Sequence, residues 1–291
     1  MIPKELLKKV RQIQIRTSRM VNDVFAGQYH SAFRGHGMEF EEVCLYQIGD
    51  DVRLIDWNVS ARFGQPFIKK YREERELTVM LVVDASRSGM FGSVNQFKLD
   101  VAAELCAVLA FSAIASNDKV GLILFTDQVE QYVPAKKGTR HVLRIIRELL
   151  YYEPQGRGTD ITEALNFLNR VTRRKSVCFL VSDFFAPDYE GALRIARRRH
   201  DLVPLTISDP REWALPNVGL VELQDAESGS RVLVDTAAKR VRRQFAANMA
   251  SLREQRAAMF RKMDTEFIDV RTDRPYIDEL VKFFHKRGSR L

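Results

Sequence analysis

A buried strand that runs directly into an Asp-x-Ser-x-Ser turn constrains this chain more than any other feature. Residues 77–84 are largely apolar and rich in β-branched side chains up to Asp84, which predicts a strand covered on both faces. Ser86 and Ser88 follow at alternate positions, so their side chains and that of Asp84 can converge above the strand's carboxyl end. Three hard oxygen groups there suggest a small cation such as Mg²⁺. A polar turn that caps the next helix explains the same residues, and this stretch alone leaves both interpretations open.

The composition is that of a globular protein with a large core. The chain has 291 residues, of which 45% are hydrophobic and 29% charged, enough for one large domain or one domain with an appendage. The net charge of +8 permits weak attraction to acidic partners but does not require it. Cys44, Cys106 and Cys178 are widely spaced, which favours reduced thiols. With no apolar leader and no run long enough to span a bilayer, we expect a cytoplasmic protein.

From residue 77 onward, strand and helix patterns alternate along the chain. This order predicts an α/β fold with a doubly wound, mostly parallel sheet, helices on both faces and one antiparallel edge strand. A polar loop over 224–230 separates two short apolar runs and predicts an inserted β-hairpin at about 218–235. We expect strands at 77–84, 119–125, 129–133, 176–181, 202–207 and 266–271, and helices at 98–116, 141–150, 162–172, 191–200, 237–263 and 276–286.

The first 75 residues have a different pattern and predict an α+β N-terminal extension packed on the main domain, which we place at 76–291. The apolar spacing over 4–25 is helical. A glycine-dotted loop at 27–37 and a segment rich in acids at 39–57 follow. The second segment predicts a polar network or a docking surface. Residues 67–71 alternate weakly and predict an edge strand.

Two later loops bring further oxygen ligands to the same edge of the predicted sheet. Thr159 lies in a Gly-x-Gly-Thr-Asp loop before the helix at 162–172, and Asp183 follows the strand at 176–181. Because the carboxyl ends of parallel strands share one edge, these side chains should lie near Asp84. Asp160 is expected to cap the helix that it opens, which leaves Thr159 as the ligand. The predicted metal site therefore consists of Asp84, Ser86, Ser88, Thr159 and Asp183.

In combination, Asp-x-Ser-x-Ser, the Gly-Thr-Asp loop and the strand-terminal Asp resemble the von Willebrand factor A domain and its metal-ion-dependent adhesion site. Over nearly the whole chain the sequence also resembles the bacterial domain-of-unknown-function family fifty-eight. Four segments carry that second resemblance: 33–40, 49–57, Arg199-His200-Asp201 and Asp209-Pro210-Arg211-Glu212.

The resemblance implies a non-enzymatic protein-interaction module that uses Mg²⁺, with Mn²⁺ or Ca²⁺ as alternatives. A partner's Asp or Glu would complete the shell of a hexacoordinate ion that this chain fills only in part. Members of the family are typically encoded beside MoxR-type AAA+ ATPases, so such an ATPase is the expected partner, in chaperone-like or complex-maturation work. The candidate partner-binding residues next to the ligands are Arg87, Arg157, Asp160 and Phe184.

Two other functions compete with this interpretation. Basic runs at 173–175, 197–199, 239–243 and 286–287 would suit nucleic acid, but they carry few aromatic side chains for base stacking. Asp84 could be a phosphoryl-accepting nucleophile of a Mg²⁺-dependent phosphatase. That chemistry calls for a second Asp two residues later, where this chain has Ser86, and the sequence contains no phosphate-binding or hydrolase motif.

Overall fold

A computed structural model describes residues 10–15, 17, 26–33, 37–74, 76–94 and 96–289. The chain forms two compact units, one of Met1–Phe33 with Thr78–Leu291 and one of Arg34–Leu77. The small unit ends two residues after the expected boundary at 75, whereas the residues before 34 belong with the main unit. Most of the helix expected over 4–25 lies outside the described residues, and packing of an N-terminal extension on the main domain stays a prediction.

The small unit is a two-stranded antiparallel ribbon with a helical excursion between its strands. β1 (Gly37–Leu45) pairs with β2 (Phe67–Glu74), and a short 3-10 helix η2 (Val52–Leu54) and α3 (Trp57–Phe63) lie between them. Asp56 starts α3 because its carboxylate accepts the backbone N–H groups of Asn58 and Val59. The strand expected at 67–71 is therefore present, but its partner is β1, whose residues the sequence predicts to lie in a loop and a polar segment.

The main unit is built on one six-stranded sheet. In chain order its strands are β3 (Thr78–Asp84), β4 (Lys119–Phe125), β5 (Val129–Lys136), β6 (Val177–Ser182), β7 (Asp201–Ser208) and β10 (Ile268–Arg271). The spatial order is β10-β7-β6-β3-β4-β5, with every pair parallel except β4 and β5. This order is typical of doubly wound sheets and confirms the predicted sheet with its antiparallel edge strand.

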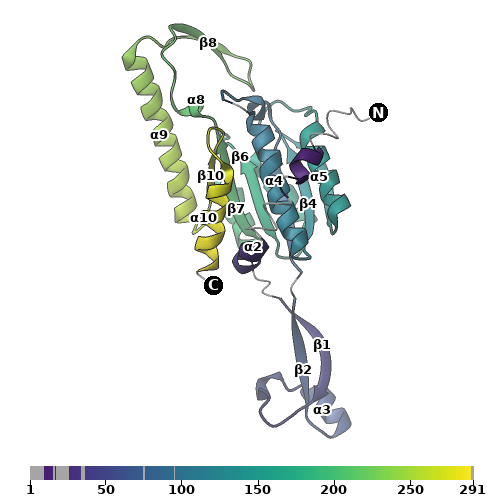
Figure 1. Cartoon of the computed structure of the whole chain (residues 1–291). Helices are drawn as coiled ribbons and strands as arrows, with labels where there is room; N and C mark the ends of the chain where they lie inside the picture. The colour runs from purple at the N-terminus through teal and green to yellow at the C-terminus, as the bar shows by residue number, and fades with distance from the viewer. Residues whose placement is uncertain are drawn as a thin grey trace. The chain divides into compact units, whose positions relative to one another are not determined.

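Helices cover both faces of this sheet (Figure 1). Alternate residues of β6 show the division: Phe179 contacts the ring of Phe33, whereas Cys178 and Leu180 belong to the core on the other face. That second core is shared with α6 (Ile161–Val171), α7 (Glu190–Arg199) and Phe260 of α9 (Lys239–Lys262). The remaining helices are α2 (Ala26–Ala32), α4 (Lys98–Ala115), α5 (Thr139–Tyr151), α8 (Pro210–Trp213) and α10 (Tyr276–Gly288).

Burial explains why β3 lies at the centre of the sheet. Val79 to Val83 are at most 1% exposed, as expected for a strand with helices on both faces. Burying each such side chain stabilises the fold by about 1.5–3 kcal/mol, so β3 is a rigid platform for the residues that follow it. Cys106 and Cys178 are buried, and all three thiols are free. Among the described helices, none is long and apolar enough to cross a membrane.

The predicted hairpin forms a separate two-stranded sheet of β8 (Leu220–Gln224) and β9 (Arg231–Asp235). Most of its side chains are exposed. In Figure 1 the hairpin lies beyond the upper end of the central sheet, and α9 starts beside it. The hairpin therefore reaches the same end of the sheet as the turn after β3.

Candidate metal site

The Asp-x-Ser-x-Ser turn folds into a compact cluster of oxygen atoms at the carboxyl end of β3. The backbone N–H of Ser86 donates to Asp84 Oδ1 over 2.9 Å. The hydroxyl oxygens of Ser86 and Ser88 lie 3.0 Å apart, and Ser86 is only 1% exposed. Ser86 precedes the 3-10 helix η3 (Arg87–Met90) but makes no side-chain cap, and α4 begins after Phe97. The turn thus gathers hydroxyls and a carboxylate without using them as helix caps.

Asp84 and Asp183 are buried together, and their negative charges repel each other. They are 8% and 7% exposed. Burial, and after it the charge of Asp183, raise the pKa of Asp84 above its usual range. Both Asp84 oxygens accept hydrogen bonds, since Ser182 Oγ donates to Oδ2 over 2.7 Å. A cation beside these carboxylates would offset the repulsion that adds to the effect of burial on this pKa.

Asp183 already has one cation beside it, the ammonium of Lys98 at the start of α4. Lys98 Nζ lies 2.7 Å from Asp183 Oδ2 and 2.5 Å from Glu212 Oε1, and Lys98 is 4% exposed. Burial by itself lowers the pKa of Lys98, but the charges of Asp183 and Glu212 outweigh it and raise that pKa. Glu212 is held in turn by the Asp209 N–H at the start of α8. This ion cluster fixes one side of the site.

Hydrogen bonds hold the loop before α6 against the end of β4. Asp160 N–H donates to the Thr126 carbonyl over 2.8 Å, and Glu130 accepts from the backbone N–H of Gly156 over 2.7 Å. A Cβ at Gly156 would lie 2.1 Å from Thr126 Oγ1, so only glycine allows this approach. Because the Ala85 N–H donates to the carbonyl of Phe125, the loop is anchored beside the residue that follows Asp84.

Among the described residues, no hydrogen bond joins the Thr159 hydroxyl to the serine pair. It donates instead to Glu227 Oε1 over 2.7 Å. Glu227 lies in the loop of the β8–β9 hairpin, so a carboxylate from the same chain is held at the predicted ligand. The structure therefore brings Asp84, Ser86, Ser88 and Asp183 to one strand edge and places Thr159 under the hairpin.

The four candidate partner-binding residues have different surroundings. Arg87 and Arg157 are exposed. Asp160 caps α6 by accepting the Glu163 N–H over 2.9 Å, as expected. Phe184 is 5% exposed and packs against Tyr189 and Phe260, which leaves its side chain no free surface for a partner. The neighbouring Phe185 is 44% exposed and takes its place at the surface.

The oxygen set suits a hard cation. Two neutral hydroxyls and two carboxylates are the ligand types that Mg²⁺ takes, and Mg²⁺ keeps several waters at such sites. Among the described residues, no group of three or more histidine, cysteine or carboxylate side chains could hold a metal ion. A cation here would therefore depend on the serine hydroxyls, with Asp84 as a charged ligand and Asp183 shared with Lys98.

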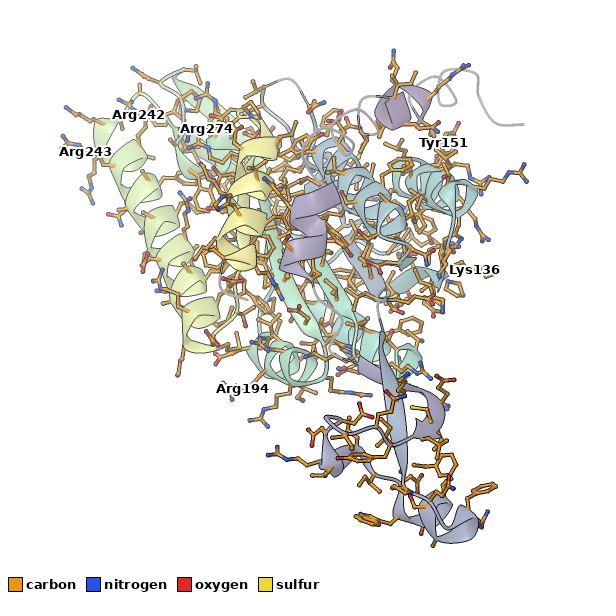
Figure 2. The ribbon with its side chains drawn as sticks, turned by 60° about the horizontal axis from the view of Figure 1, so that its bottom comes forward. Lys136, Tyr151, Arg194, Arg242, Arg243 and Arg274 are labelled. Atoms are coloured by element: carbon orange, nitrogen blue, oxygen red, sulfur yellow. The ribbon has the colours of Figure 1, made fainter. Side chains whose placement is uncertain are left out.

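The basic runs do not form one continuous positively charged surface. The runs at 173–175 and 197–199 precede β6 and β7, so they lie at the opposite end of the sheet from Asp84. The run at 239–243 starts α9 near the hairpin, and Figure 2 shows Arg242 and Arg243 there, apart from Arg194 on α7. Arg242 donates to the Thr236 and Ala237 carbonyls, so part of this run stabilises the fold.

Several residues that build the site were not found from the sequence. Lys98 gave one signal, because a lysine in the first turn of a helix opposes the helix dipole unless an acid compensates it. Ser182 stands directly beside Asp183 and could have been recognised as a partner of Asp84. Glu130 and Glu227 gave no local signal, since their contacts depend on how distant loops meet.

Comparisons with known proteins agree with this architecture. The family model described as "Protein of unknown function DUF58" matches residues 42–256. An uncharacterized protein of Mycobacterium tuberculosis is 32% identical over 288 residues, which cover 97% of this chain and 90% of that protein. The crystal structure of an aerotolerance-related membrane protein from Bacteroides fragilis covers 74% of this chain and all of that chain, with a TM-score of 0.50 and 17% identity.

A further similar structure is the von Willebrand factor A domain of SpRpn10, with a TM-score of 0.39 and 11% identity over 70% of this chain and 93% of that chain. The strand order of the central sheet and the Bacteroides fragilis structure carry the assignment of the fold. Together they confirm the α/β fold with a mostly parallel central sheet that the sequence predicts.

Proposed function

The chain belongs to the DUF58 family of proteins of unknown function, and from this premise we propose that it is a non-enzymatic, metal-dependent protein-interaction module. The observation that carries the proposal is the serine pair, with its oxygens 3.0 Å apart, next to the buried carboxylate of Asp84 at the sheet's carboxyl edge. Such edges are where open α/β sheets bind ligands. Mg²⁺ is the proposed ion.

Charge explains why this site would bind a partner. Asp84 supplies one full negative charge, whereas the serines are neutral and Asp183 is partly neutralised by Lys98. A divalent ion held this way stays short of negative charge and keeps replaceable waters. A glutamate or aspartate of another protein can replace one water and complete the shell, so metal binding and partner binding become coupled.

The proposed partner is a MoxR-type AAA+ ATPase, in chaperone-like or complex-maturation work. This step is supported by the family alone, because family members are typically encoded beside such ATPases. The exposed Arg87 and Arg157 flank the site and would attract an acidic surface on that partner.

The arrangement offers little to an enzyme. Both oxygens of Asp84 accept hydrogen bonds, and the Ser86 hydroxyl lies 3.0 Å from the Ser88 hydroxyl and also contacts the Asp84 carboxylate. The buried His200 pairs with Ser176 at the opposite end of β6. A Mg²⁺-dependent phosphatase assay on the wild type and on Asp84→Asn checks this, and activity that disappears in the variant would favour the enzyme.

The experiment that tests the proposal is a pull-down with the MoxR-type ATPase in Mg²⁺ or in EDTA. Wild type should retain the ATPase only with Mg²⁺, and Asp84→Ala should retain none under either condition. Asp188→Asn is a matched control because Asp188 is an exposed carboxylate on the loop that follows Asp183. Mg²⁺-dependent retention by Asp84→Ala equal to that of wild type would disprove the site assignment.

A further inference from the structure

The β8–β9 hairpin is attached to the main unit only lightly. Its strands are mostly exposed. At its base, buried Thr236 donates through its hydroxyl to the Gly219 carbonyl over 2.6 Å and accepts the Val218 N–H over 3.1 Å. Arg242 of α9 donates to the Thr236 carbonyl. The hairpin is therefore fixed at its base, and the position of its tip depends on the contacts that the tip itself makes.

The tip is a preformed loop that presents Glu227. Asp225 accepts the backbone N–H groups of Glu227 and Ser228 over 3.1 Å and 2.6 Å, and the Asp225 N–H donates to the Ser230 carbonyl. The Ser228 N–H and hydroxyl bonds hold the pKa of Asp225 below its usual range. The loop thus keeps its shape by itself, and the Glu227 side chain is free to contact something outside the hairpin.

That contact is the predicted metal ligand Thr159. Thr159 Oγ1 donates to Glu227 Oε1 over 2.7 Å. A Cβ at Gly158 would lie 3.8 Å from Glu227 Oε2, so the carboxylate lies close against this loop. Oε2 has no hydrogen-bond partner among the described residues. When the threonine proton is donated to Glu227, the lone pairs of Thr159 Oγ1 remain available to a cation.

We propose that Glu227 is a displaceable ligand, supplied by this chain, of the predicted cation site, which consists of Asp84, Ser86, Ser88, Thr159 and Asp183. The inference rests on the proposed function, because it concerns the same cation. Glu227 is the type of group that a partner would offer, and it is held at Thr159, a predicted ligand of that cation. An acidic residue of a partner therefore has to replace Glu227, and the hairpin has to move away when the partner binds.

The structure explains how the ligand can be replaced. The hairpin tip is joined to the Thr159 loop by one hydrogen bond between described residues, while the base bonds at Thr236 need not break when the tip leaves. A partner carboxylate restores the negative charge that the ion loses when Glu227 leaves, so the number of charges around the ion does not change. The partner's other contacts then decide whether Glu227 or the partner carboxylate binds the ion.

The test is a titration of the full-length protein with Mn²⁺, followed by water-proton relaxation, which reports both affinity and the number of waters on the ion. In Glu227→Gln we expect Mn²⁺ to bind roughly tenfold more weakly, equivalent to about 1.4 kcal/mol. The relaxivity of bound Mn²⁺ should rise, because water replaces the carboxylate. Glu222→Gln removes the same charge from an exposed position of the same hairpin and should match wild type.

The outcomes separate this inference from the proposed function. Asp84→Asn removes a proposed ligand charge, and wild-type Mn²⁺ binding by that variant would overturn the site itself. If Asp84→Asn loses Mn²⁺ while Glu227→Gln keeps the wild-type relaxivity, the cation site stands and the role of Glu227 is disproved. A relaxivity that rises equally in Glu222→Gln also disproves it, because general charge would then be the cause.

Discussion

Replacing Lys98 with methionine removes the ammonium that lies between Asp183 and Glu212 and keeps an unbranched side chain of similar length. Lys98 Nζ lies 2.7 Å and 2.5 Å from the two carboxylates, and Lys98 is 4% exposed. At an effective dielectric constant of about 20, each contact is worth roughly 6 kcal/mol of attraction, most of which offsets the desolvation of the charges. Leaving the buried carboxylates without their cation should lower the free energy of unfolding by about 3–5 kcal/mol.

The pKa of Lys98 is raised in the fold, so its contribution is fully present at neutral pH and is lost only above the usual lysine pKa. Urea denaturation at pH 7, followed by circular dichroism, measures the effect. Lys282→Met is the matched control, because Lys282 also lies 2.7 Å from a carboxylate, that of Glu279, but is 70% exposed. It should lose less than about 1 kcal/mol. Equal losses in the two variants would refute the argument from burial.

Two further predictions concern the stability and the rigidity of the main unit. Burial, together with Arg199, lowers the pKa of His200 to about 4, so stability should fall, by at most about 3 kcal/mol, as the pH drops from roughly 6.5 through 4. Urea denaturation across this range should show a smaller change in the free energy of unfolding with pH for His200→Asn than for the wild type. Equal changes in the two proteins would contradict this prediction. In Gly156→Ala the Cβ would lie 2.0 Å from Asp127 Oδ1, so the Thr159 loop should move and Mg²⁺ affinity, measured calorimetrically, should fall. Gly191→Ala has open space around its Cβ and should bind Mg²⁺ as wild type does.

The central sheet could be predicted because its strands are buried on both faces and read as continuous apolar runs. β3 is the clearest case, with Val79 to Val83 buried. β1 could not be predicted in the same way. It belongs to a two-stranded ribbon, and its acidic residues at 39, 41 and 42 remove the alternation that marks a half-buried strand.

The candidate site was predictable where its residues share one turn or follow neighbouring parallel strands, as Asp84 and Asp183 do. Asp84, Ser86 and Ser88 form one turn, so their spacing is enough to bring their oxygens together. The contacts of Thr159 with Glu227 and of Asp183 with Lys98 join residues 68 and 85 positions apart. No local pattern specifies such pairs, because they depend on how the hairpin and α4 approach the sheet.

The burial of Phe184 was also not predictable from the sequence. Phe184 and Phe185 are both aromatic and both follow Asp183, so sequence alone did not show which one faces solvent. The backbone of Phe184 has a φ of 59°, a conformation that non-glycine residues seldom adopt. It directs Phe184 into the core against Phe260, 5.4 Å between ring centroids, and leaves Phe185 exposed.

Calorimetric titration of this chain with Mg²⁺ asks directly whether the oxygen cluster at the end of β3 binds a cation. The measurement needs the wild type, Asp84→Asn and the exposed-site control Asp188→Asn. We expect one Mg²⁺ per chain in the wild type and in Asp188→Asn, and no measurable binding in Asp84→Asn. Equal Mg²⁺ binding by all three proteins would contradict this expectation, and so would a lack of Mg²⁺ binding by all three.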